Sequence, residues 1–103
     1  MKLSLCLATH NEENNLAGCL ESAKTLANEI IVVDGSSTDK TVEIAKRYGA
    51  RVIVTDNPAM FHINKQKALD EAKGEWILQL DADERVSPEL AGEIKKVINV
   101  SQK

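Results

Sequence analysis

Short apolar runs and longer amphipathic stretches alternate along the chain. The apolar runs are rich in Val, Ile and Leu and are typical of buried strands; they cover residues 3–8, 29–34, 51–55 and 76–80. The stretches between and after them place apolar residues on one side of a helix, over residues 12–26, 37–49, 63–73 and 87–98. The pattern therefore predicts four strands, each followed by a helix.

Local signals mark the ends of two of these helices. Thr38 is a predicted N-cap, Asp39 suits the positive end of that helix, and Gly49 is predicted to end it. Ser87 is the predicted N-cap of the last helix, with Pro88 at its first helical position.

Such an alternating series predicts an α/β fold, with a mostly parallel sheet and helices on both of its faces. Right-handed crossovers restrict the topology, and we expect the strand order 3-2-1-4. In this order the winding reverses between strands 1 and 4, and ligands of open α/β sheets bind beyond the carboxyl ends of the strands at that reversal.

The fourth strand, WILQL, conflicts with its predicted place at the edge of the sheet. Its nearly continuous apolar character is typical of a central parallel strand, and a bare apolar edge invites pairing. We therefore expect either a truncated part of a larger sheet or a homo-oligomer that pairs through this edge.

Composition narrows the class of protein. The 103 residues suffice for one small domain, residues 1–103, with 43% hydrophobic and 28% charged residues. The net charge of −3 and only three aromatic residues argue against nucleic-acid binding. Cys6 and Cys19 fall on apolar positions and are predicted to be reduced core residues, which fits a cytoplasmic protein. No signal peptide or transmembrane segment is predicted.

Polar residues gather where three of the predicted strands end. The sequences are ATHNEE after the first strand, VVDGSSTD across the end of the second, and LDADE after the fourth. Because parallel strands end at the same edge, and neighbours are about 4.8 Å apart, we expect these clusters within roughly 10–15 Å of one another. That span suits a nucleotide.

Asp81 and Asp83 are candidate metal ligands. If the chain stays extended there, both side chains point the same way, and two converging carboxylates repel unless a cation lies between them. Oxygen ligands favour Mg²⁺ or Mn²⁺, which commonly bridges carboxylates to a diphosphate. The alternative is that these acids only lead into the helix at Ser87.

Other polar residues of this edge have two interpretations each. Asp34 is expected either to accept a hydrogen bond from a base or ribose, or to form an Asx-turn or helix cap. Thr9 and His10 are candidates for contacts with a base or sugar, whereas Asn11 is interpreted as the N-cap of the following helix. Lys65 either meets a diphosphate or lies on a solvated helix face.

In this order, ATHNEE, VVDGSSTDKT, NKQKAL and LDADE resemble the N-terminal, nucleotide-sugar-binding half of a family 2 glycosyltransferase with the Rossmann-like GT-A fold. The resemblance runs from Leu3 to about Val100 and is nearest to bacterial enzymes of lipopolysaccharide core and other cell-envelope glycan synthesis. It implies a nucleoside-diphosphate sugar as donor, most often a UDP-sugar, and Mg²⁺ or Mn²⁺ as cofactor.

The resemblance also assigns roles to individual positions. The strand end that lines the nucleoside corresponds to Ala8, Thr9 and His10, and Glu12 corresponds to an acid near the base. Asp34 corresponds to the residue that reads the base, although many members have a second Asp where this chain has Gly35.

Lys65 falls in the segment that contacts the diphosphate, and Asp81, Ala82 and Asp83 correspond to the DxD motif. In that motif Asp81 lies nearer the ribose and metal, and Asp83 is the main metal ligand. The catalytic base and acceptor pocket belong to the second half of the family's domain, so no catalytic residue is assigned.

The resemblance implies the donor- and metal-binding part of an inverting enzyme that transfers a sugar to a cell-envelope glycan or lipid, in the cytoplasm or at the inner face of the membrane. One alternative is a receiver-like signalling module that binds Mg²⁺ and accepts a phosphoryl group on Asp34 or Asp81. It would need a fifth strand ending in lysine, which this sequence does not provide. Another is a non-catalytic α/β fragment whose acids are only caps.

Overall fold

The computed structural model describes residues 2–56 and 61–101, and it has the predicted alternation of strands and helices. In chain order the elements are β1 (Leu3–Thr9), α1 (Leu16–Ala23), β2 (Glu29–Asp34), α2 (Thr41–Arg47), β3 (Arg51–Val54), α3 (Phe61–Glu71), β4 (Trp76–Gln79) and α4 (Pro88–Ser101). Residues 57–60, between β3 and α3, lie outside the described residues.

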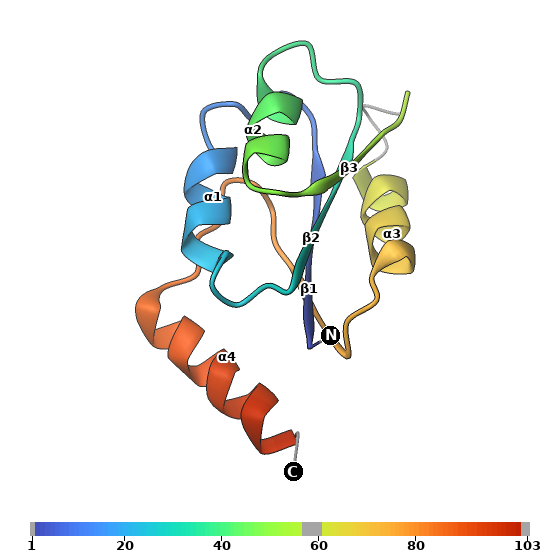
Figure 1. Cartoon of the computed structure of the whole chain (residues 1–103). Helices are drawn as coiled ribbons and strands as arrows, with labels where there is room; N and C mark the ends of the chain where they lie inside the picture. Colours follow the sequence, from blue (N-terminus) through green and yellow to red (C-terminus); the bar gives the residue numbers. More distant parts are fainter. Residues whose placement is uncertain (1, 57–60, 102–103) are drawn as a thin grey trace.

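The four strands form one parallel sheet in the order β3-β2-β1-β4, as predicted (Figure 1). In the register of β1 with β2, Thr9 lies opposite Asp34, so the two strands end level with each other. Beside them, β4 pairs with β1 as far as Cys6 and Gln79, and the amide of Leu80 still donates to the Cys6 carbonyl at 3.2 Å. The residues after Leu80 therefore leave the sheet beside the end of β1.

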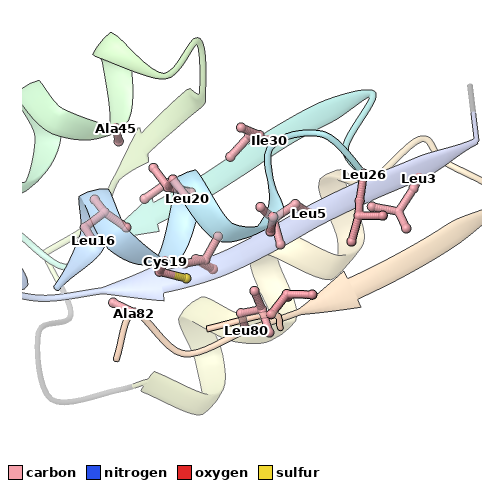
Figure 2. Packing of buried hydrophobic residues seen from close by; sticks show 14 of the residues in the cluster. Leu3, Leu5, Leu16, Cys19, Leu20, Leu26, Ile30, Ala45, Leu80 and Ala82 are labelled. Atoms are coloured by element: carbon pink, nitrogen blue, oxygen red, sulfur yellow. The ribbon is translucent and has the colours of Figure 1, made fainter. Parts of the chain in front are cut away.

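Helices cover both faces of the sheet, with α1, α2 and α4 on one side and α3 on the other (Figure 1). The alternation of side chains along β1 explains this division: Leu5 and Leu7 face α1, whereas Cys6 packs with Ala68 of α3. Figure 2 shows the larger cluster, in which α1 packs on β1 and Ala82 lies at the edge nearest the strand ends. The predicted burial of both cysteines is confirmed, and both are free thiols.

The first helix is shorter than the predicted 12–26, and Asn11 is not its N-cap. The helix begins at Leu16, and Asn15 occupies the N-cap position without a side-chain cap bond. Residues 12–15 form a turn instead, in which the Glu12 carbonyl accepts from the amides of Asn15 and Leu16. The amide of Glu12 donates to the Thr41 hydroxyl at the start of α2, and the amide of Glu13 donates to the Asp39 carboxylate just before it. These contacts with a segment distant in the sequence set where α1 begins.

The predicted cap at Thr38 is also wrong. Helix α2 begins at Thr41, and Asp39 accepts the Thr41 amide through Oδ1 at 2.9 Å. By contrast, Gly49 has a φ of 79° and follows the helix end as predicted, because a residue without Cβ adopts this conformation at no steric cost. Ser87 is confirmed as the cap of α4, since its hydroxyl accepts the Leu90 amide at 3.1 Å.

β4 lies at the edge of the described sheet, as the strand order requires. Beside it, an apolar groove of about 310 Å³ runs between β4 and α4, and Ile77, Leu90 and Val97 remain about half exposed there. Among the described residues, no helix has the length and apolar character needed to cross a membrane.

Candidate functional site

A pocket of about 360 Å³ opens at the carboxyl edge of the sheet, on the α3 side of the β1 end. Residues from four parts of the chain line it: Ala8, Glu12, Phe61, Lys65, Asp81, Ala82 and Asp83. Six of these seven were predicted site residues, and Phe61, at the start of α3, is the addition. The structure therefore brings together most of the side chains that the sequence singled out.

The segment that carries both candidate metal ligands is a tight turn, not the extended chain assumed from the sequence. The Glu84 amide donates to the Asp81 carbonyl at 2.9 Å, and the Glu84 carboxylate accepts the Asp81 amide at 2.7 Å. Ala82 is 1% exposed and anchors the turn in the core. Asp81 and Asp83 are both exposed and both line the pocket, and they reach it from a turn.

Arg85 secures this turn from outside the pocket. Its guanidinium donates to the carbonyls of Ala82, at 3.0 Å, and Glu84, at 2.9 Å. It packs directly against Gly18 of α1, where an added Cβ would lie 2.6 Å from Nη2. Sequence reasoning missed Glu84 and Arg85 as supports of the site, and a glycine inside a helix was the only signal that something approaches α1 closely.

Cys19 lies beneath the same turn and stays protonated. Burial raises the pKa of its thiol to about 11; Arg85 lowers this pKa, whereas the carboxylates of Glu84, Asp83 and Asp81 raise it. The neutral thiol faces the Asp81 carbonyl, with a sulfur–oxygen distance of 3.6 Å. The thiol thus serves as a packing residue and weak donor under the turn.

Lys65 and Asp81 form an ion pair across the pocket, with 3.0 Å between Nζ and Oδ1. The two side chains are 36% and 54% exposed, so both can be reached from solvent. Of the two interpretations of Lys65, a helix face in contact with solvent alone does not describe this arrangement, because the ammonium is paired with a candidate metal ligand.

Asp34 lies on the same edge but does not line this pocket. Its side chain is fully buried and accepts hydrogen bonds from the Thr9 hydroxyl at 2.7 Å, the Ser37 amide at 2.8 Å and the Ser37 hydroxyl at 2.6 Å. In this conformation the carboxylate organises the turn after β2, as in the Asx-turn interpretation. A direct contact between Asp34 and a base would require these bonds to rearrange.

The loops after β1 and β2 are fastened to each other by side-chain bonds. His10 Nδ1 lies 2.7 Å from the Gly35 carbonyl oxygen, and Asn11 accepts the Thr38 amide at 2.8 Å. Asn11 and Ser36 both have positive φ, 53° and 56°, a conformation that costs energy outside glycine. Two neighbouring loops in strained conformations, each bonded to the other, form a preorganised rim beside the pocket.

The donor set of the pocket fits a hard divalent cation. Asp81 and Asp83 offer carboxylate oxygens to the pocket, and Mg²⁺ is usually held by one or two carboxylates together with water and phosphate oxygens. Within residues 2–56 and 61–101, no group of three His, Cys, Asp or Glu side chains is arranged to hold a metal. The two aspartates therefore fit a cation whose remaining ligands come from a bound phosphate and water.

Comparison with known families identifies the chain. A model of glycosyl transferase family 2 matches residues 4–101. The chain belongs to this family. Among its curated relatives, an uncharacterized glycosyltransferase of Rickettsia typhi is 43% identical over 98 residues, which is 93% of this chain and 32% of the relative. The prophage-derived glycosyltransferase SunS of Bacillus subtilis is 38% identical over 96 residues, 91% of this chain and 23% of SunS.

Solved structures give the same fold. TarS residues 1–349 of S. aureus in complex with UDP superpose with a TM-score of 0.83 at 28% identity, covering 97% of this chain and 32% of that chain. Glucosyl-3-phosphoglycerate synthase of Mycobacterium tuberculosis with Mn²⁺, UDP and glucosyl-3-phosphoglycerate gives a TM-score of 0.63 at 26% identity, covering 79% and 33% of the two chains. The fold is thus the predicted Rossmann-like GT-A arrangement, and this family 2 glycosyltransferase chain spans 32% of the Rickettsia typhi relative and 23% of SunS.

Proposed function

We propose that this chain is the part of a glycosyltransferase that binds a nucleoside-diphosphate sugar, most often a UDP-sugar, together with Mg²⁺ or Mn²⁺. Family membership and the UDP and Mn²⁺ complexes of its structural relatives support the class of ligand. We assign this ligand to the pocket that is lined by Glu12, Lys65, Asp81 and Asp83.

The charge of this pocket is the observation that carries the proposal. Three carboxylates, from Glu12, Asp81 and Asp83, face one ammonium, from Lys65, among the described lining residues. The lining of the pocket thus carries a net negative charge, which repels a diphosphate that enters alone. Binding of a diphosphate therefore needs a divalent cation between it and the aspartates. The net negative charge of the lining disfavours a free diphosphate and favours a diphosphate that is bound to a divalent cation.

Asp83 and Asp81 are the residues that would hold the cation, in the roles that the family resemblance assigns to them. The bound cation would offset the negative charge that develops on the departing nucleoside diphosphate. Glu84 and Arg85 would keep the two carboxylates in place by fixing the turn that carries them. Ala8 and Ala82 give the pocket an apolar floor between these charges.

The nucleoside would lie along the rim formed by the loops after β1 and β2. We assign Thr9, His10 and Glu12 to this part of the site, and we assign Asp34 to the same subsite as the residue that holds Thr9 and Ser37 in position. Because Gly35 has no side chain, base contacts near this position would come from the backbone and from His10.

For the whole enzyme we propose transfer to a cell-envelope glycan or lipid acceptor, as in lipopolysaccharide synthesis, with the donor site in the cytoplasm or at the inner face of the membrane. The catalytic base and acceptor pocket would come from outside these 103 residues, so sugar turnover by this chain alone is not expected. This assignment follows the family resemblance.

The exposed edge of β4 is proposed to pair with a strand of another polypeptide segment, either in a larger domain or in a second copy of the chain. The half-exposed Ile77 of β4 and the apolar groove beside it support this. Sedimentation at increasing concentration tests the pairing of two copies, and a clean monomer at high concentration would remove that version.

Calorimetric titration with UDP, in the presence and absence of Mn²⁺, tests the proposed donor site. We expect saturable binding of UDP only with Mn²⁺, and the same titration with GDP measures the preference for the base. A folded sample, checked by far-UV circular dichroism, that binds neither nucleotide with Mn²⁺ would refute the proposal.

Two other functions make different predictions. A receiver-like module would gain the mass of one phosphoryl group on incubation with acetyl phosphate, whereas we expect no mass change. In a non-catalytic fragment, Asp83→Ala would leave any nucleotide binding unchanged. The family match favours the glycosyltransferase over both.

A further inference from the structure

The exposed carboxylate of Asp81 already has a cationic partner. Its Oδ1 lies 3.0 Å from the ammonium of Lys65, within the same pocket as Asp83. A metal ion that binds through Asp81 must therefore compete with Lys65 for this oxygen, and the ammonium also repels the incoming cation.

Lys65 is able to leave this position without any change in the fold. It lies on α3, its side chain is partly exposed, and a lysine side chain carries its charge on a flexible four-carbon stem. Asp81, by contrast, sits in a turn whose amide and carbonyl are both bonded to Glu84. The mobile partner of the pair is thus the lysine.

A diphosphate in the pocket would give the displaced ammonium a new partner. Within the described lining residues Lys65 is the single basic group, so it has no cationic neighbour to compete with for phosphate oxygens. A diphosphate carries more negative charge than the single carboxylate of Asp81, so it attracts the ammonium more strongly once a metal ion occupies Asp81. The exchange therefore becomes favourable only when metal and diphosphate are present together.

We propose that Lys65 holds the place of the cation on Asp81 in the metal-free site and passes to the diphosphate when metal and nucleotide bind. This inference rests on the proposed donor site and adds a positioning role that couples its two ligands. Because coupling between two ligands is reciprocal, UDP raises the affinity for Mn²⁺ by the same factor by which Mn²⁺ raises the affinity for UDP. The ion pair weakens the binding of metal alone to the empty site.

Removing the lysine charge should shift the two affinities in opposite directions. In Lys65→Met, Mn²⁺ alone should bind about two- to fivefold more tightly, because no ion pair has to be broken. UDP in saturating Mn²⁺ should bind about tenfold more weakly, because a charged phosphate contact is lost. A purely structural role of Lys65 would move neither affinity in this way.

Two titrations test this proposal. In the first, Mn²⁺ alone is titrated and the free ion is measured by electron paramagnetic resonance. In the second, UDP is titrated at saturating Mn²⁺ in a calorimeter. Lys67→Met is the matched control, since Lys67 is exposed on the same helix and lies beside a separate depression with Gln66 and Asp70. Lys67→Met should leave both affinities unchanged. Lys65→Arg keeps the positive charge, so its affinities for Mn²⁺ and UDP should lie close to those of the unaltered chain.

The outcomes separate this inference from the proposed function. If the unaltered chain binds UDP with Mn²⁺ but Lys65→Met binds Mn²⁺ alone no more tightly, the place-holding role is overturned and the donor site stands. If the folded, unaltered chain binds no UDP with Mn²⁺, the donor site itself fails and the inference falls with it. Opposite shifts in Lys65→Met, absent in Lys67→Met, support both.

Discussion

The hydroxyl of Thr9, at the end of β1, donates to the buried carboxylate of Asp34, at the end of β2, over 2.7 Å. The same carboxylate accepts the amide and hydroxyl of Ser37, so one side chain joins two strand ends and the turn that follows. We therefore expect Asp34 to influence ligand binding indirectly, by holding Thr9 and Ser37 in position beside the candidate donor site.

Asp34→Ala should lower the free energy of unfolding by about 2–3 kcal/mol, because the substitution leaves the buried hydroxyl of Thr9 and the partly buried donors of Ser37 without this acceptor. Urea denaturation measures this change. Asp70→Ala, at an exposed position of α3 whose carboxylate accepts a bond from Gln66, serves as the control and should stay within about 0.5 kcal/mol of the unaltered chain. Equal stability of the two variants would contradict the role given to Asp34.

Asp83→Asn should separate ligand binding from stability. The exposed amide replaces a carboxylate with the same shape but no charge, so we expect unchanged urea denaturation and at least about tenfold weaker Mn²⁺-dependent binding of UDP. Calorimetry of the unaltered chain and the variant measures the difference. Undiminished affinity in Asp83→Asn would show that this carboxylate does not hold the metal.

Gly18→Ala, in α1, should disturb the turn of residues 81–85 through its contact with Arg85. The new Cβ would meet three guanidinium atoms of Arg85 at 2.6–2.8 Å, so the arginine must shift relative to the carbonyls of Ala82 and Glu84 that it bonds. We expect weaker Mn²⁺-dependent UDP binding and no net gain in stability, since the shift of the flexible Arg85 side chain weakens its bonds and offsets the better helix propensity of alanine.

Gly92→Ala is the control for this substitution. Gly92 also lies within a helix, α4, but nothing lies within 4 Å of an added Cβ. This variant should gain about 0.5–1 kcal/mol in thermal or urea denaturation and keep its affinity for UDP. If both alanine variants behave alike, the contact between Gly18 and Arg85 has no influence on the site.

The two buried thiols should make the fold sensitive to alkaline pH. Burial raises the pKa of Cys6, like that of Cys19, from the ordinary value of 9.0 to about 11. Between these values the unfolded chain loses thiol protons that the folded chain keeps, so stability is full below pH 9 and falls as the pH rises toward 11.

Urea denaturation from pH 8 to 10.5 measures this dependence, and the Cys6→Ala/Cys19→Ala variant should show a shallower fall. Both thiols should also resist alkylation at pH 8 until the chain is unfolded, because the thiolate is the reactive form. Rapid modification of the folded chain would contradict their burial and raised pKa.

The pattern of apolar residues was enough to predict the strands, their order and the edge at which polar residues gather. Strand residues such as Ile31 and Val32 alternate between two buried faces, and a parallel α/β arrangement is the main way to bury both. The shared edge then follows from topology, which is why the cluster with Asp81 and Asp83 could be placed there from the pattern, whereas Ala8 and Glu12 were added by the family resemblance.

Tertiary structure decided the details that depend on contacts between distant segments. The amides of Glu12 and Glu13 bond to Thr41 and Asp39, which shortens α1 and removes Asn11 from its cap. Asp34 accepts the hydroxyl of Thr9, 25 residues earlier in the chain, and the burial of Ala82 in the core anchors the Asp81–Glu84 turn, which replaces the expected extended chain. Local propensity carries no information about partners 25 or more residues away.

The sequence by itself thus determined which chemistry is present and at which edge of the sheet, because hydrophobic periodicity and parallel topology fix where strands end. Only the tertiary structure decided which carboxylates face the pocket and which are buried supports, and that Lys65 is paired with Asp81. These choices depend on distances of a few ångströms between segments far apart in the chain, which side-chain packing and hydrogen bonds set.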